Sequence, residues 1–134
     1  MQGEANRIEP GKRPLSSMSP TIVLRDGKPW LATGSPGGSL IITSVLQTLL
    51  NATVFDMNIA SAAAGARVHH QWQPDKLRVE RGISPDTIRL LQGMGHEVEV
   101  GKRTLGRTQS IVLENGWLYG ATDTRRPGGW VAGY

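Results

Sequence analysis

Two pairs of small residues could do chemistry in this sequence. Ser16 and Ser17 are neighbours, and two adjacent hydroxyls can hold a carboxylate. Gly37 and Gly38 come just before a long apolar segment. A glycine turn at the start of a helix can aim free backbone N–H groups at an oxyanion, and the helix dipole adds to the attraction. Together these residues predict an anion-binding site that contains no attacking group.

A predicted hairpin brings the two pairs to one end of a sheet. Residues 21–25 are a short apolar strand, Asp26-Gly27 is a strong turn signal, and residues 28–33 supply the return strand. The serine pair comes just before the first strand, and the glycine pair comes just after the second. Antiparallel pairing should therefore place both pairs beside a single ligand.

The remaining segments predict a mixed α+β fold. Residues 39–51 form a helix that is apolar on most faces, so we expect it to be buried between layers. Asp56 or Asn58 can cap a second, alanine-rich helix at residues 60–66. Strands are predicted at residues 77–80, 96–100, 110–113 and 117–120, with a helix at 87–92 after Ser84-Pro85 and a hairpin turn at Asn115-Gly116. This order favours a layered sandwich with antiparallel sheet.

Composition narrows the possible functions. The 134 residues suffice for one domain, and residues 1–14 are expected to be an extended arm leading into residues 15–134. The net charge is +4, but basic residues are scattered among acidic ones, which disfavours a nucleic-acid partner. Without cysteine there is no disulfide or cysteine-ligated zinc. No segment has a membrane-spanning length or the apolar core of a secretion signal, so we expect no membrane partner.

Other polar residues have structural interpretations. His69 and His70 would point to opposite faces of a strand, and no nearby residues have the spacing of a zinc site. We expect no metal site, and we give these histidines a hydrogen-bonding role beside Trp72. Met18 is expected to pack in the core. Ion pairs at the surface or in loops are expected from three residues near the C-terminus: Asp123, Arg125 and Arg126.

Two motifs carry a family resemblance. Ser-Ser-Met-Ser-Pro at residues 16–20 and Gly-Ser-Pro-Gly-Gly at residues 34–38 closely resemble the C-terminal part of the small subunit of gamma-glutamyltranspeptidase, also called glutathione hydrolase. The resemblance continues through His69-His70-Gln71-Trp72 and on to the closing Ala132-Gly133-Tyr134. It implies part of an N-terminal-nucleophile hydrolase: an αββα sandwich of two stacked sheets faced by helices, whose other strands come from segments outside these residues.

The resemblance also implies roles for the two pairs. Ser16 and Ser17 match the family's serines that bind the α-carboxylate of the γ-glutamyl group. Gly37 and Gly38 match the glycines that form its oxyanion hole. The family transfers a γ-glutamyl group from glutathione to amino acids, peptides or water through an acyl-threonine intermediate, with no metal or cofactor.

The family's attacking group has no match in this sequence. That group is an N-terminal threonine whose own amine acts as the base, whereas this sequence begins Met1-Gln2 and its threonines are internal. We therefore expect these residues to be inactive alone and to associate with the remainder of the transpeptidase, meaning the large subunit and the start of the small subunit, or with themselves. The alternative is a stand-alone, non-catalytic remnant of the family that binds amino acids or self-assembles. The family resemblance implies a periplasmic or extracellular location for a full-length parent.

Overall fold

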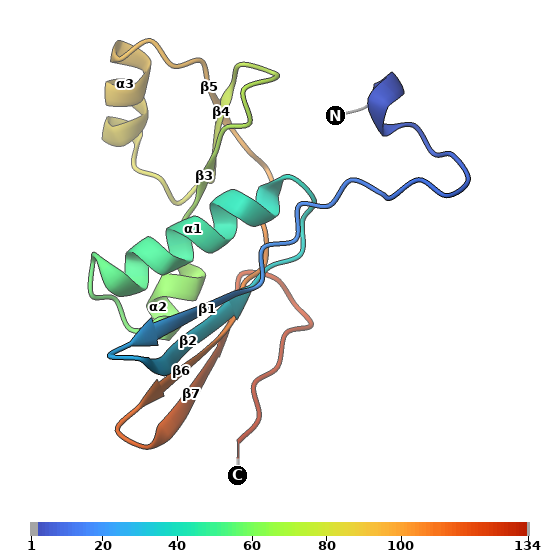
Figure 1. The fold of residues 1–134 in the computed structure, drawn as a ribbon. Helices are drawn as coiled ribbons and strands as arrows, with labels where there is room; N and C mark the ends of the chain where they lie inside the picture. Colours follow the sequence, from blue (N-terminus) through green and yellow to red (C-terminus); the bar gives the residue numbers. More distant parts are fainter. Residues whose placement is uncertain (1–2, 134) are drawn as a thin grey trace.

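A computed structural model describes residues 3–133 of the chain (Figure 1). Met1, Gln2 and Tyr134 lie outside the described residues. The elements, in chain order, are η1 (Glu4–Asn6), β1 (Thr21–Arg25), β2 (Lys28–Gly34), α1 (Leu40–Thr53), α2 (Ile59–Ala64), β3 (Val68–His69), β4 (Leu77–Val79), α3 (Pro85–Gly93), β5 (Val98–Val100), β6 (Gln109–Glu114) and β7 (Trp117–Thr122). None of the helices in this part of the chain combines the length and apolar character needed to cross a membrane.

An antiparallel four-stranded sheet, in the order β1-β2-β6-β7, organises the fold. Its two hairpin turns, Asp26-Gly27 and Asn115-Gly116, lie where the sequence predicts them. All four turn residues have positive φ, a conformation that Asp-Gly and Asn-Gly pairs adopt readily and that matches the twist of the flanking strands. Next to the turn of the first hairpin Arg25 pairs with Lys28, and a shift of register between Val23 and Leu24 then brings Thr21 opposite Thr33.

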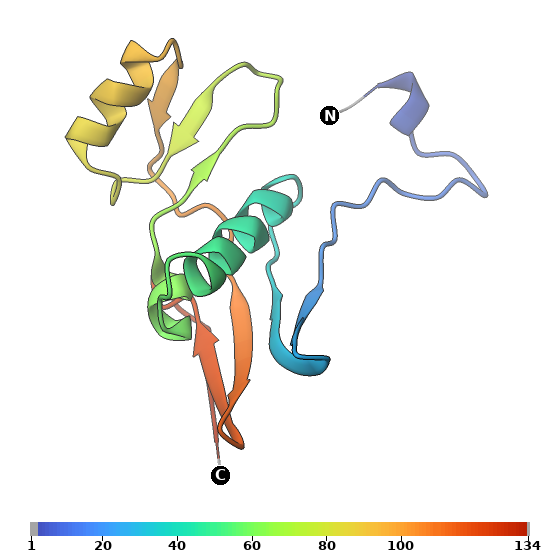
Figure 2. The ribbon, with the colours of Figure 1, turned by 60° about the vertical axis from the view of Figure 1, so that its left-hand side comes forward.

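Helices α1 and α2 cover one face of this sheet (Figures 1 and 2). The core between the layers joins Leu31 of β2 and Val112 of β6 to Ala52 of α1 and Ala62 of α2. Small alanine side chains allow α2 to approach the strands closely. The predicted helical pair and the predicted hairpins therefore form one packed unit.

The expected burial of α1 on all sides is wrong for one face of the helix. Its buried residues include Ile41 and Val45, whereas Ile42, Leu46 and Leu50, at intervals of four along the opposite face, are exposed. The reason is that the elements contacting α1, namely α2, β2 and β3, reach only one of its faces. The chain thus carries an apolar helix face without an internal partner among the described residues.

Helix starts follow the capping chemistry of the sequence. Asn58, not Asp56, caps α2, and its Oδ1 accepts the N–H of Ser61 at 2.9 Å. Ser84 caps α3, and its Oγ accepts the N–H of Thr87 at 3.2 Å. Pro85 occupies the first helical position after this cap, as the sequence predicts, so α3 begins at Pro85.

A second, three-stranded sheet has the order β3-β4-β5. Strands β3 and β4 are antiparallel, and β4 and β5 are parallel because α3 crosses between them (Figure 2). The strand on which the sequence analysis places His69 is β3, and it is only two residues long, too short for an alternating pattern to define its bounds. The fold is α+β with antiparallel sheet and flanking helices, as predicted.

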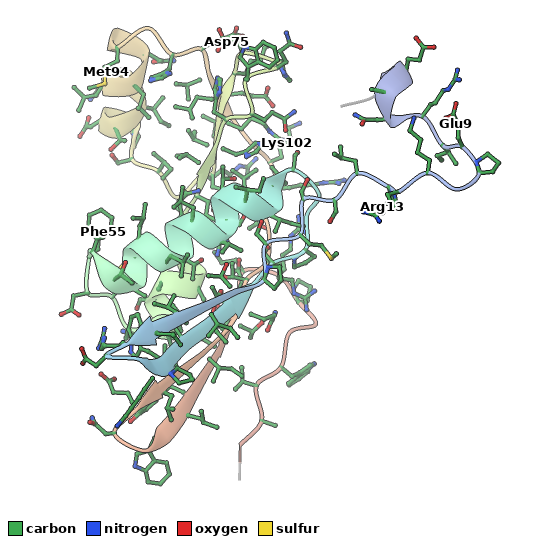
Figure 3. The ribbon with its side chains drawn as sticks, in the orientation of Figure 1. Glu9, Arg13, Phe55, Asp75, Met94 and Lys102 are labelled. Atoms are coloured by element: carbon green, nitrogen blue, oxygen red, sulfur yellow. The ribbon has the colours of Figure 1, made fainter. Side chains whose placement is uncertain are left out.

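The segment before β1 extends away from both sheets (Figures 1 and 3). Glu9 and Arg13 lie in this segment, and η1 is its one regular element among the described residues. Residues 3–14 belong to the stretch that the sequence assigns to an extended arm.

The loop before β6 packs closely against α1 at Gly106. This glycine has φ +71°, and a Cβ atom there would lie 2.9 Å from the Oγ of Ser35 and closer still to Ser44 on α1. A side chain would therefore be strained by its backbone conformation and would also overlap buried neighbours.

Replacing Gly106 by alanine should destabilise the fold more than the matched change at Gly116. Gly116 also has positive φ, but a Cβ there would meet nothing within 4 Å. We expect Gly116→Ala to cost about 1 kcal/mol through backbone strain alone. Gly106→Ala should cost about 3 kcal/mol or more, because overlap adds to the strain. Urea denaturation of both variants measures the difference, and equal losses would contradict the close packing.

Candidate active site

The register of the first hairpin sets the position of the candidate site. Because Thr21 faces Thr33, the segment before β1 and the segment after β2 leave the sheet at the same end. Both views show the segment before β1 running alongside the connection from β2 to α1 (Figures 1 and 2). The structure therefore brings the two predicted segments to one region of the molecule.

The glycine turn presents free backbone donors at the start of α1. Gly37 has φ +140° and Gly38 has φ +58°, and both residues are exposed. Their carbonyl oxygens accept the N–H groups of Leu40 and Ile41, each at 3.1 Å. Within residues 3–133, no hydrogen bond uses the N–H of Gly37 or Gly38. These two N–H groups are thus available to an anion.

The N-terminus of α1 carries an uncompensated positive dipole end. Ser39 occupies the N-cap position, but its side chain does not cap the helix; its hydroxyl donates to Oε1 of Gln71 at 2.7 Å. No acidic residue lies in the first turn. A helix of 14 residues in this state attracts negative charge to the glycine turn.

The serine pair lies on an open segment. Ser16 is exposed, and its Oγ accepts the N–H of Met18 at 3.2 Å. Ser17 is half-buried, and its carbonyl accepts the hydroxyl of Ser19 at 3.2 Å. No hydrogen bond within the described chain joins either serine to the glycine turn. Met18 is 77% exposed, so its predicted place in the core is wrong: this segment lies outside the packed layers.

The two histidines, His69 in β3 and His70 just after it, form separate hydrogen bonds. His69 is buried; its Nδ1 lies 2.8 Å from the hydroxyl of Thr43 on α1, and its Nε2 lies 3.1 Å from Oε1 of Gln71. His70 is exposed and accepts the N–H of Trp72 on Nδ1 at 3.1 Å. The sequence analysis did not predict the hydrogen bond between His69 and Thr43. This bond connects β3 to α1, the helix that begins at the glycine turn.

No group of three or more His, Cys, Asp or Glu residues suited to a metal ion occurs within residues 3–133. Cavities in the described part of the chain include ones of about 340, 720 and 880 Å³, and the first of these borders the glycine turn at Pro36. That cavity is also lined by Arg107 and Trp130.

Asp123 forms the predicted ion pair with Arg125 in the loop after β7, but this pair lies in a buried charge cluster and not at the surface. Its side chain is fully buried, and its Oδ2 accepts hydrogen bonds from Nη1 of Arg67 and Nη2 of Arg125, each at 2.7 Å. Arg125 also pairs with the buried Glu80. Arg126, by contrast, is exposed and donates to the carbonyl of Thr104 at 3.1 Å. Asp123 is buried because β7 ends beneath the segment that carries Arg67.

Burial acts on the pKa values of this cluster. Desolvation raises the pKa of Glu80, against backbone hydrogen bonds from Leu105 and Arg67 that lower it. Desolvation also raises the pKa of Asp123, against the nearby positive charge of Arg67. The pKa of Arg67 is lowered by the same loss of solvent. The charges of the cluster attract one another, but removing them from water costs free energy that offsets this attraction.

The raised pKa values predict a pH dependence of stability. Between the unfolded and folded pKa values of Glu80, the folded protein binds more protons than the unfolded chain, so the free energy of unfolding should fall as pH rises through the folded pKa. Glu80→Gln should flatten this slope, whereas Glu114→Gln, at an exposed carboxyl on β6, should leave it unchanged. Urea denaturation from about pH 4 to pH 8 measures it. An unaltered slope in Glu80→Gln would contradict the assignment.

A helix pair covers one face of an antiparallel sheet, and a glycine turn opens the first helix. This is half of the layering expected of an αββα sandwich. The family model of gamma-glutamyltranspeptidase matches residues 1–133. The chain belongs to the gamma-glutamyltranspeptidase family.

Similar proteins support the assignment to this family. The glutathione hydrolase proenzyme of Escherichia coli (strain K12) is 56% identical over 133 residues, which are 98% of this chain and 23% of the relative. The glutathione hydrolase proenzyme of Bacillus subtilis (strain 168) is 42% identical over 128 residues, 94% of this chain and 22% of the relative. The chain thus spans less than a quarter of the length of these two relatives.

Solved structures show the same fold. A mutant of Helicobacter pylori gamma-glutamyltranspeptidase has a TM-score of 0.84 at 46% identity, covering 93% of this chain and 69% of that one. The enzyme from Pseudomonas nitroreducens complexed with L-DON has a TM-score of 0.87 at 39% identity, covering 99% of this chain and 70% of that one. The predicted family and fold class are confirmed.

Proposed function

We propose that this chain is the C-terminal part of a gamma-glutamyltranspeptidase small subunit and supplies half of its γ-glutamyl site. Ser16 and Ser17 bind the α-carboxylate of the γ-glutamyl group. The N–H groups of Gly37 and Gly38 stabilise the oxyanion formed when the γ-glutamyl carbonyl is attacked. The reaction is γ-glutamyl transfer from glutathione to an amino acid, a peptide or water.

The free glycine amides at the start of α1 carry this proposal. Two N–H groups without partners in residues 3–133 and an uncompensated helix dipole fit a developing negative charge. The hairpin adds the serine hydroxyls at the same end of the sheet. A carboxylate at the serines and an oxyanion at the glycines are the two negative groups of one γ-glutamyl moiety in the acyl-transfer intermediate.

The rest of the enzyme must complete the site. This proposal assigns the attacking threonine, whose own α-amine acts as the base, to the remainder of the enzyme. In this proposal, residues 1–14 are an arm and residues 15–134 are the small-subunit portion. Exposed apolar side chains on the uncovered sheet face, including Ile22, Ile111 and Leu118, support association with the remaining layers.

The 134 residues alone should not hydrolyse a γ-glutamyl anilide. Without the threonine no acyl intermediate can form, so release of the coloured aniline should equal the blank. Assembly with the missing segments of a family enzyme should restore turnover. Turnover by the isolated chain would refute the proposed division of the site. Heat on mixing the inactive chain with glutamate would instead favour the amino-acid-binding alternative.

The serine pair should matter for binding the γ-glutamyl substrate. In the assembled enzyme, Ser16→Ala combined with Ser17→Ala removes hydrogen bonds to a charged group, so KM for the γ-glutamyl donor should rise about 10- to 100-fold. Ser61→Ala, on the exposed surface of α2, is the matched control and should leave KM unchanged. Steady-state kinetics measure both. An unchanged KM in the double variant would remove the serines from the site.

A further inference from the structure

The loop before β6 lies directly against the glycine turn. The N–H of Arg107 donates to Oγ of Ser35 at 2.9 Å, and the hydroxyl of Ser35 lies 2.9 Å from the carbonyl of Pro36. A Cβ atom on Gly37 would lie 3.7 Å from Cα of Gly106. The backbone of this loop therefore forms one wall of the turn that presents the free amides.

Both the N–H and the carbonyl of Leu105 form hydrogen bonds with buried side chains. The carboxylate of Glu80 accepts the N–H of Leu105, and Nη1 of Arg67 donates to its carbonyl at 3.2 Å. The hydroxyl of Ser44 on α1 adds a longer contact to the same carbonyl at 3.4 Å. Leu105 is itself buried, so the loop has little freedom beside the turn.

Glu80 is the residue on which these contacts converge. Its side chain is buried, and its second carboxylate oxygen accepts the N–H of Arg67 at 2.9 Å and pairs with Arg125. One carboxylate thus holds the loop and also fixes the arginine that holds the loop's carbonyl. No part of Glu80 reaches the glycine turn directly; the path runs through Leu105, Gly106 and Arg107.

We propose that Glu80 is a positioning residue for the oxyanion donors Gly37 and Gly38, acting through the loop 105–107 and Ser35. This inference rests on the proposed function. A glutamine at this position has only one acceptor oxygen, and its NH₂ group would face donors that a carboxylate satisfies. The loop would then relax and release Ser35. The glycine amides would lose alignment with the developing oxyanion, while the serine pair would be unaffected.

Nuclear magnetic resonance of the ¹⁵N-labelled chain tests this coupling without any catalysis. Glu80→Gln should shift the amide signals of Gly37 and Gly38 and speed exchange of the Arg107 amide at least about tenfold. Signals of the Asn115-Gly116 turn should stay in place. The control Glu114→Gln should change none of the three amides. Unchanged glycine and Arg107 amides in a folded Glu80→Gln chain would overturn the proposal.

A second variant serves if Glu80→Gln does not fold. Ser35→Ala cuts the link between loop and turn but leaves Glu80 and its partners intact. It should shift the amides of Gly37 and Gly38 and leave that of Leu105 unchanged. Unshifted glycine amides in this variant would equally overturn the proposal.

Kinetics of the assembled enzyme separate positioning from a merely structural role. Glu80→Gln should lower kcat about 10- to 100-fold, because small misplacements of transition-state donors are costly, with KM for the γ-glutamyl donor unchanged. Glu80→Asp, which keeps the charge, should recover part of kcat. Parallel loss of kcat and gain in KM would overturn the role. If the unaltered assembly shows no turnover, the proposed function fails, while the amide signals still decide whether Glu80 positions the turn.

Discussion

The pairing of Thr21 with Thr33 is the constraint on which the site depends. A slip of one residue in this hairpin would turn every side chain of β1 to the opposite face and displace the two segments that leave its open end. The Asp26-Gly27 turn fixes the pairing of Arg25 with Lys28, and the shift of register between Val23 and Leu24 then brings Thr21 opposite Thr33. On the other side of β2, the hydroxyls of Thr33 and Ser110 meet at 2.8 Å and tie β2 to β6. The meeting of the serine segment and the glycine turn at one end of the sheet therefore follows from backbone pairing.

The buried charge cluster has a different physical character from the apolar core. Two arginines and two carboxylates balance one another, yet desolvation raises the carboxyl pKa values, so the cluster is a poor source of net stability. Its hydrogen bonds are directional, and they join the ends of β4 and β7 to the segment before β3 and the loop before β6. An apolar substitute would fill the same volume but would not fix where the peptide of Leu105 lies. Under the proposed function, such directionality matters because the amides of the neighbouring turn have to point at an oxyanion.

Features of the fold that depend on neighbouring residues could be predicted from the sequence. Features that depend on contacts between distant residues could not. Turns at Asp26-Gly27 and Asn115-Gly116 and the cap at Ser84 depend on a few neighbouring residues, so the sequence alone predicts them. Arg67 and Asp123 lie 56 positions apart, and neither has a local signal that it will be buried. The site follows the same division. The predicted hairpin correctly placed the serine segment and the glycine turn at one end of the sheet. The contacts by which Glu80 holds the loop beside the glycine turn could be seen only in the structure. The binding roles of the serines and glycines stay predictions.

The distribution of apolar surface is consistent with a chain that forms inner layers of a larger enzyme. A sheet that packs only against α1 and α2 would alternate apolar and polar residues, but Ile22, Ile111 and Leu118 are exposed on its other side. The residues near the C-terminus cover part of that side, where Val131 lies against Gly120 and a side chain at position 120 would block the approach. The uncovered remainder fits the second sheet of an αββα sandwich. Under the proposed function, that second sheet and the threonine both come from the remainder of the enzyme. The packing that removes apolar surface from water would therefore also place the nucleophile at the end of the sheet that carries the glycine amides.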